Sequence, residues 1–184
     1  DCLRVVEEFG LDGIDVDWEY PTSSAAEISS SPEDTDNFTE LMKDLRKVLG
    51  NELLLTFASA ASADYVDFTA VEPYVDFVNI MAYDMATAPK HHSALYESEI
   101  SGGMTSDKAA RAHLAAGMPA HKLVLGMPFY GRGSGRYADF NDFKDIKKDI
   151  EAYEIWDEKA QVPYIADTDG TLIVGYDNPR SLKI

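Results

Sequence analysis

The chain has 184 residues, of which 45 % are hydrophobic and 27 % charged, a composition that predicts a globular protein with a sizeable core and, by default, one domain. Its 33 acidic residues outnumber 16 basic ones and give a net charge of -17, which repels phosphate backbones and anionic membranes and argues against nucleic acid as a partner. No apolar run approaches the roughly 18 residues of a membrane span. The acidity suits a neutral substrate or a cation, or a surface that only confers solubility.

The first ten residues predict a helix, because Leu3, Val6 and Phe9 recur at helical spacing and Gly10 is placed to end it. The chain therefore opens on a structural element without a signal peptide, and we expect it to begin within a domain. The lone cysteine, Cys2, cannot form an internal disulfide, so cysteine usage does not indicate the compartment.

Four apolar runs predict the strands of a parallel sheet. They cover residues 13–18, 53–58, 75–83 and 122–131. Helical patterns lie between them, within 62–72, over 106–116 and most clearly from Pro32 to the stop at Gly50. The apolar face of that last helix comprises Phe38, Leu41, Met42, Leu45, Val48 and Leu49. Strands that alternate with helices predict right-handed βαβ units and an α/β fold.

The pattern changes beyond Gly131. Residues 131–156 are polar and helix-prone, and residues 162–177 predict two short strands around the turn "DTDG". We therefore expect a small α+β insertion at this end of the chain.

The stretch "LDGIDVDWEYP", residues 11–21, carries four carboxyls in one apolar run. In a strand Asp15, Asp17 and Glu19 share one face, with α-carbons about 6.6 Å apart in sequence order. The opposite face comprises Ile14, Val16 and Trp18. Neighbouring negative charges and partial burial favour protonation, so at least one carboxyl should hold a proton near neutral pH.

Glu19 is the candidate general acid, because it ends the strand and parallel sheets carry their chemistry at the carboxyl ends of strands. The two aspartates would tune its proton. Helix caps or surface ion pairs are the alternative for scattered acids, but the apolar opposite face leaves no cheap way to expose the whole strand. A Mg²⁺ or Ca²⁺ site is the other alternative, because clustered oxygens bind these ions well.

The segment "DGIDVDWE" matches the DxxDxDxE signature of family 18 glycoside hydrolases, the chitinases and their relatives, with Asp12, Asp15, Asp17 and Glu19 at the signature positions. Three further segments resemble that family in the same order along the chain. They are "MAYD" at 81–84, "KLVLGMPFYGR" at 122–132 and "VPYIADTDGTLIVGYDNPRSLKI" at 162–184.

The resemblance implies part of a (β/α)8 TIM barrel, from the helix before strand four through strand seven. Residues 1–132 would form this partial barrel, 133–178 an α+β insertion domain, and 179–184 the return towards the barrel. A full barrel needs about 250 residues, so the remaining barrel strands would come from a full-length chain.

The resemblance also implies a mechanism without metal or cofactor. Glu19 would protonate the glycosidic oxygen, and Asp17 would position the N-acetyl group whose carbonyl attacks the anomeric carbon, in a substrate-assisted, retaining reaction. Asp15 would share a proton or hydrogen bond with Asp17, and Asp12 would brace the base of the strand.

By the same resemblance, Tyr83 would hydrogen-bond the acetamido oxygen, Met81 would form the floor of the sugar pocket, and Asp84 would contact a neighbouring sugar. Tyr130 and Arg132 match positions that line the cleft. Core packing is the alternative for Met81 and Tyr83, and a loop hydrogen bond is the alternative for Tyr130 and Arg132.

Two departures from the family pattern concern aromatic platforms, and one is that the tryptophan which the resemblance assigns to strand eight lies outside these 184 residues. The loop "ATAPKHHSALY", residues 86–96, lacks the tryptophan often found there, so a product-side stacking platform is not expected. Adjacent side chains diverge, so His91 and His92 are interpreted as loop packing and solvent contacts rather than a metal pair, and Trp156 as core of the insertion domain.

The function that follows is a chitinase-like glycosidase acting on β-1,4-linked N-acetylglucosamine polymers. An endo-β-N-acetylglucosaminidase acting on glycans is the alternative within the same mechanism, and a non-catalytic chitin-binding lectin is the alternative from another class. Such lectins lose the acid, whereas Glu19 is present. We expect the isolated chain to be inactive or nearly so, and family resemblance favours a secreted protein.

Overall fold

The computed structural model describes residues 1–184, which form two compact units. The first unit comprises residues 1–80 and 111–124, and the second comprises residues 81–110 and 125–184. No helix in the chain has the length and apolar character that crossing a membrane requires.

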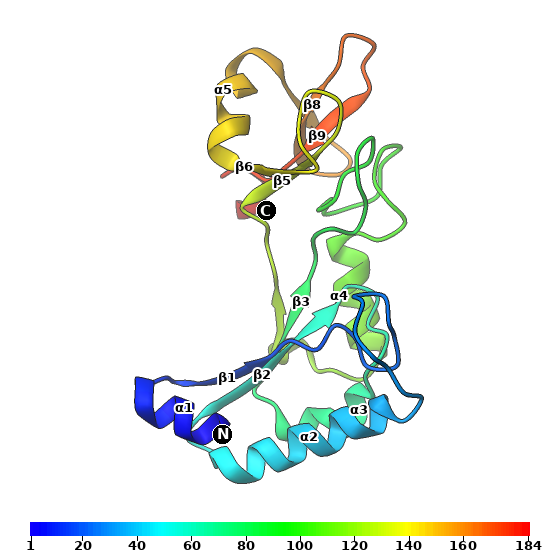
Figure 1. Ribbon diagram of the computed structural model, residues 1–184. Helices are drawn as coiled ribbons and strands as arrows, with labels where there is room; N and C mark the ends of the chain where they lie inside the picture. The colour runs from blue at the N-terminus through cyan, green and yellow to red at the C-terminus, as the bar shows by residue number, and fades with distance from the viewer. The chain divides into compact units, whose positions relative to one another are not determined.

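The first unit is built on a four-stranded parallel sheet in the order β1-β2-β3-β4 (Figure 1). Its strands are β1 (Gly13–Val16), β2 (Leu54–Ala60), β3 (Phe77–Met81) and β4 (Leu123–Leu125). The helices that alternate with them are α1 (Cys2–Phe9), α2 (Asp34–Leu49), α3 (Phe68–Val71) and α4 (Ser106–Ala115), with 3-10 helices η1 (Glu72–Tyr74) and η2 (Ala120–Lys122). The predicted alternation of strands and helices is confirmed.

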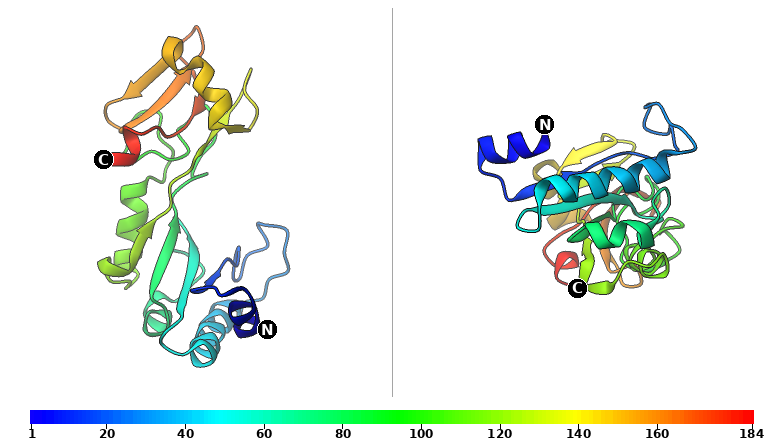
Figure 2. Two further views of the ribbon diagram at one scale, coloured as in Figure 1. Left: turned by 90° about the vertical axis from the view of Figure 1, so that its left-hand side faces the viewer. Right: turned by 90° about the horizontal axis from the view of Figure 1, so that it is seen from below.

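The core of the first unit lies between α2, α3 and the sheet. Phe38 of α2 packs edge to face on Phe57 of β2, with ring centroids 5.2 Å apart. The ring centroid of Phe57 lies 6.0 Å from that of Phe68 on α3. The views in Figure 2 show α2 running alongside the strands of this sheet. Leu41 and Val48, predicted on the buried face of α2, are exposed. The stripe of α2 that packs into the core comprises Phe38, Met42, Leu45 and Leu49, at steps of four, three and four residues. Leu41 and Val48 lie at the margin of this stripe.

The second unit contains a five-stranded antiparallel sheet in the order β6-β5-β9-β8-β7. The strands are β5 (Tyr130–Gly133), β6 (Phe140–Asp142), β7 (Glu154–Asp157), β8 (Val162–Ala166) and β9 (Leu172–Gly175), with helix α5 (Phe143–Tyr153) and 3-10 helix η3 (Ser181–Lys183). Ile146 of α5 packs with Ile165 and Val174 of the sheet. A β-carbon on Gly131 would lie 2.9 Å from the backbone oxygen of Gly175, as well as 2.5 Å from Ile146 Cδ1, so this close approach requires glycine.

The structure corrects two predictions about the strands. The run 122–131, predicted as one strand, forms β4 and β5, which belong to different sheets. Pro128 between them has no N–H to donate to a ladder, which accounts for the break. The segment 131–156, predicted as polar and helix-prone, holds β5, β6 and β7 as well as α5. The two strands predicted around "DTDG" are confirmed as β8 and β9.

Candidate active site

The carboxylate segment begins in β1 and continues beyond it. The ladder of β1 ends at Val16, two residues earlier than predicted, so Asp17 and Glu19 follow the strand rather than lie in it. The alternation nevertheless persists, because Ile14, Val16 and Trp18 all pack against the core of the first unit. The apolar side of the segment is therefore half-buried against this core, and the acids occupy the other side.

Asp15 is held by the two neighbouring strands. Its Oδ1 accepts hydrogen bonds from the hydroxyl of Thr56 on β2, at 2.5 Å, and from the side-chain amide of Asn79 on β3, at 2.9 Å. Thr56 is buried and lies directly opposite Asp15 in the parallel register. Two donors on one oxygen fix the orientation of this carboxylate. Sequence reasoning missed both donors, and the only signal was a polar residue inside each apolar run.

Asp17 is the carboxyl whose affinity for a proton is raised. Burial raises the pKa of Asp17, and the charge of Glu19 and a hydrogen bond with Glu19 raise this pKa further, followed by the charge of Asp15. A hydrogen bond between two carboxyls requires one proton between them. Asp17 therefore binds a proton more readily than an isolated aspartate does, in line with the chemistry expected of three crowded acids.

Glu19 has a second partner that sequence reasoning missed. The hydroxyl of Tyr20 donates a hydrogen bond to Glu19, and burial together with this bond raises the pKa of Tyr20. The ring of Tyr20 stacks on Tyr65, with centroids 4.9 Å apart and planes 19° from parallel. Tyr65 thus orients the ring of Tyr20, and Tyr20 in turn orients Glu19 through the hydrogen bond.

A second cluster of polar side chains surrounds Asp84 in the second unit. Its Oδ1 is 2.9 Å from Arg132 Nη1 and 3.5 Å from His92 Nδ1, and the hydroxyl of Tyr130 also donates to it. Burial raises the pKa of Asp84, but the three hydrogen bonds outweigh burial and lower this pKa to about 2. Asp84 is therefore ionised at neutral pH and acts only as a hydrogen-bond acceptor.

Tyr130 and Arg132 lie on β5 and face this carboxylate. The ring of Tyr130 contacts Tyr83 at 6.3 Å and His92 at 5.5 Å. Burial and the hydrogen bond to Asp84 raise the pKa of Tyr130. The structure thus brings Tyr83, Asp84, Tyr130 and Arg132 together, as a resemblance in sequence alone could not show.

Arg132 links Asp84 to an aromatic residue on the next strand. Its Nη2 lies 2.8 Å from Asp139 Oδ1, and its Cζ lies 4.0 Å from the centroid of the Phe140 ring. Met81 ends β3 and is half-buried, and its role in the sugar pocket remains a prediction.

The two adjacent histidines point to different acids. His92 contacts Asp84, whereas His91 Nε2 lies 3.2 Å from Asp157 Oδ2. Both histidine side chains are fully buried, so the predicted loop packing is correct and the predicted solvent contact is wrong. Burial lowers the pKa of His91 despite the hydrogen bond with Asp157. Trp156 lies on β7, with the Arg180 guanidinium 3.7 Å from its ring.

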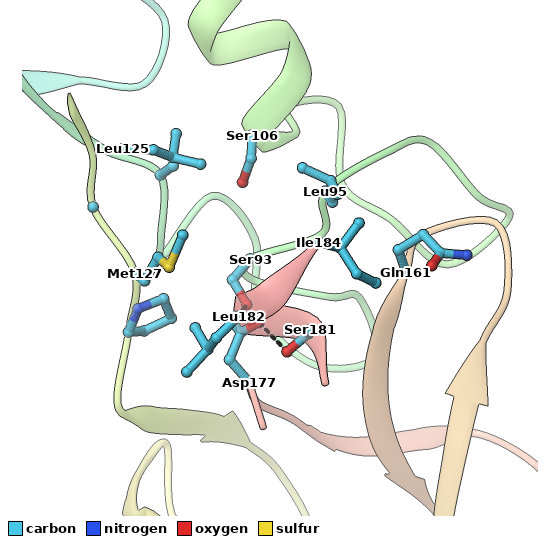
Figure 3. Close-up of a pocket in the computed structure, with 13 residues that line it drawn as sticks. Ser93, Leu95, Ser106, Leu125, Met127, Gln161, Asp177, Ser181, Leu182 and Ile184 are labelled. Atoms are coloured by element: carbon cyan, nitrogen blue, oxygen red, sulfur yellow. Dashed lines mark hydrogen bonds between the residues drawn. The ribbon is translucent and has the colours of Figure 1, made fainter. Parts of the chain in front are cut away.

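A cavity of about 230 Å³ in the second unit has none of the predicted site residues in its lining. Asp177 lies in it and accepts hydrogen bonds from Ser93 Oγ at 2.6 Å and Ser181 Oγ at 2.7 Å (Figure 3). Burial raises the pKa of Asp177 even though both hydroxyls lower it. The rest of the lining is mostly apolar and includes Leu125, Met127, Leu182 and Ile184. This acid holds the C-terminal segment in place.

The family model for glycosyl hydrolases family 18 matches residues 1–184. Chitinase A1 of Niallia circulans is 33% identical over 98% of this chain and 33% of its own length. Two solved structures are similar. A family 18 N-acetylglucosaminidase from Paenibacillus barengoltzii has a TM-score of 0.84 at 30% identity, covering 99% of this chain and 63% of the other. The Ostrinia furnacalis Group IV chitinase in complex with allosamidin has a TM-score of 0.81 at 28% identity, covering 98% of this chain and 58% of the other.

The chain thus spans about a third to about half of the curated relatives that it matches over nearly its whole length. Its parallel sheet, the four carboxyls at the signature spacing and the solved structures agree on a TIM-barrel-like α/β fold. The family model covers every residue of the chain. The chain belongs to glycosyl hydrolases family 18.

Proposed function

We propose that this chain is the central part of a chitinase-like glycosidase that hydrolyses β-1,4-linked N-acetylglucosamine. The observation that carries the proposal is the placement of Asp17 and Glu19 directly after β1, beside an Asp15 that Thr56 and Asn79 anchor. The relatives support it, since chitinase A1 is named for this activity and the Ostrinia furnacalis chitinase binds allosamidin.

In the proposed reaction Glu19 donates its proton to the glycosidic oxygen, and the bond from that oxygen to the anomeric carbon breaks. The acetamido carbonyl oxygen of the same sugar forms the new bond to the anomeric carbon, while Asp17 accepts a hydrogen bond from the acetamido N–H. Water then attacks the anomeric carbon, the bond from that carbon to the acetamido oxygen breaks, and Glu19 takes a proton from the attacking water. Two inversions at one carbon give overall retention.

The surrounding residues would prepare this step. Asp15 stays fixed by Thr56 and Asn79, and its negative charge raises the pKa of Asp17. We assign Tyr83 to the acetamido oxygen, and the ionised Asp84 to a hydroxyl of a neighbouring sugar, with Met81 as the floor of the sugar pocket.

We also propose that β1 to β4 correspond to strands four to seven of a (β/α)8 barrel that a longer chain completes. Residues 1–132 would belong to the barrel, 133–178 to the insertion domain and 179–184 to the return. The share of each relative that the chain covers supports this assignment. Secretion is part of the same proposal.

The test is Glu19→Gln in the complete enzyme, because the amide keeps the shape of the side chain and loses the proton. Turnover of chitooligosaccharides should fall by about 10²–10⁴-fold, while binding of the same oligosaccharides persists. Glu27→Gln, at an exposed loop position of the first unit, is the matched control and should leave turnover unchanged. Near-normal turnover by Glu19→Gln would rule out Glu19 as the acid, and binding without any hydrolysis by the unmodified enzyme would favour the lectin.

A further inference from the structure

Phe140 is a large aromatic residue that β6, an edge strand, presents with 59% of its surface exposed. It lies opposite Arg132 in the antiparallel register of β5 and β6. The Arg132 guanidinium covers one face of the ring, with Cζ 4.0 Å from the centroid. A ring that has one face covered and still exposes more than half of its surface must leave its second face open.

The ring is held in place, unlike an ordinary exposed side chain. Arg132, which supports it, is itself fixed by carboxylates on two sides, Asp84 at 2.9 Å and Asp139 at 2.8 Å. Tyr130 contacts the ring of Phe140 from the side, with centroids 5.7 Å apart. Phe140 therefore loses little conformational freedom when a ligand covers its open face, which is the property that makes an aromatic residue a good anchor.

Arg132 also sets the distance between this ring and Asp84, because one guanidinium contacts both. Asp84 offers an ionised acceptor for hydroxyl groups, and Phe140 offers a flat apolar face. A sugar ring matches both groups, because it has hydroxyls at its rim for Asp84 and C–H groups on its faces for Phe140. One oligosaccharide can therefore reach both groups through successive rings.

We propose that the open face of Phe140 is a stacking platform for a sugar of the substrate, beyond the sugar at Asp84, and that it sets the enzyme's preference for longer chains. The inference rests on the proposed function for the identity of the sugar. If Phe140 only shielded Arg132, removing the Phe140 ring would disturb Asp84. The affinity for oligosaccharides of every length would then fall equally. If Phe140 is a platform, its removal instead lowers the affinity only for those oligosaccharides that are long enough to reach it.

The test is calorimetric titration of N-acetylglucosamine oligomers of two to six sugars into the complete enzyme carrying Glu19→Gln, with and without Phe140→Ala. The affinity for the longest oligomer should fall about tenfold, which equals 1.4 kcal/mol, and the affinity for the shortest by less than about twofold. Phe140→Trp keeps a flat ring and should restore binding. Tyr153→Ala is the matched control, since Tyr153 is 52% exposed and has the Arg136 guanidinium 5.2 Å from its ring.

Equal weakening at all lengths, or no weakening at any length, overturns the platform, as does failure of the Glu19→Gln enzyme to bind any oligomer. Hydrolysis of the same oligomers by enzyme that retains Glu19 is measured in parallel. If nothing is hydrolysed but Phe140→Ala weakens long oligomers selectively, the proposed function fails and the platform stands.

Discussion

Asp84→Asn should destabilise the second unit at neutral pH and have little effect in acid. The pKa of Asp84 is 3.8 in an unperturbed side chain and about 2 in the folded chain. At 1.36 kcal/mol per pKa unit, this difference of roughly 1.8 units corresponds to about 2.4 kcal/mol. The side chain is 35% exposed, so solvent screening reduces the expected effect to about 1 kcal/mol.

The sign follows from the direction of the shift. A carboxyl with a lowered folded pKa stabilises the fold above its unfolded pKa, and this stability is lost as pH falls through the folded value. The difference between the original chain and Asp84→Asn should therefore be complete above pH 5 and shrink between about pH 4 and pH 2.

Urea unfolding from pH 7 to pH 2 measures this difference. The chain has two tryptophans, so a Trp18→Phe background leaves Trp156 as the reporter of the second unit. Asp139→Asn is the matched control, because Asp139 contacts the same guanidinium but is 61% exposed, so its loss should cost only a few tenths of a kcal/mol. A destabilisation by Asp84→Asn that is the same at pH 7 and pH 2, or none at pH 7, would refute the reasoning.

Two further predictions follow from the proposed function. Fully deacetylated chitosan should not be cleaved, because it lacks the acetamido carbonyl that attacks the anomeric carbon. Reducing-sugar release from chitosan at a rate close to that from chitin oligomers would indicate a nucleophile supplied by the protein. The isolated 184-residue chain should hydrolyse chitotriose far more slowly than the complete enzyme, because the acid alone cannot hold the sugar in its reactive distortion. Comparable rates would mean that the missing strands are dispensable.

The elements that could be predicted are those whose pattern is local. The helix at the start carries its own period and its own stop at Gly10, whose backbone is left-handed with φ of 62°. The run 122–131 contains one local break, Pro128, but its apolar pattern continues on both sides of this proline. Its division into β4 and β5 depends on which sheet each half joins, and that is decided by pairing with residues far along the chain.

Two strands of the second sheet, β6 and β7, were missed for a related reason. β6 and β7 each have three or four residues and polar or charged ends, so neither has enough residues to show a period of two. They are strands because β5 and β8 supply partners for their backbone groups. Tertiary pairing therefore overrides a sequence that is helix-prone by composition.

The partners of the candidate site were missed because they depend on register. Thr56 is 41 residues from Asp15 along the chain, and Asn79 is 64. In a parallel pair, residues directly opposite each other point to the same face, so pairing Asp15 with Thr56 brings the hydroxyl to the carboxylate. A slip of one residue would oppose Asp15 to Phe57 or Leu55, both fully buried, and would leave the carboxylate without this donor.

The run "LLLTFA" is too evenly apolar to fix that register by alternation, since a strand buried on both faces has no polar side to align. Asp15 itself supplies the missing constraint. In the observed register Thr56, the only residue of the run with a hydroxyl, donates a hydrogen bond to the carboxylate of Asp15. The same polar residue thus satisfies the acid and selects the register that assembles the site, which links the stability of this sheet to its proposed chemistry.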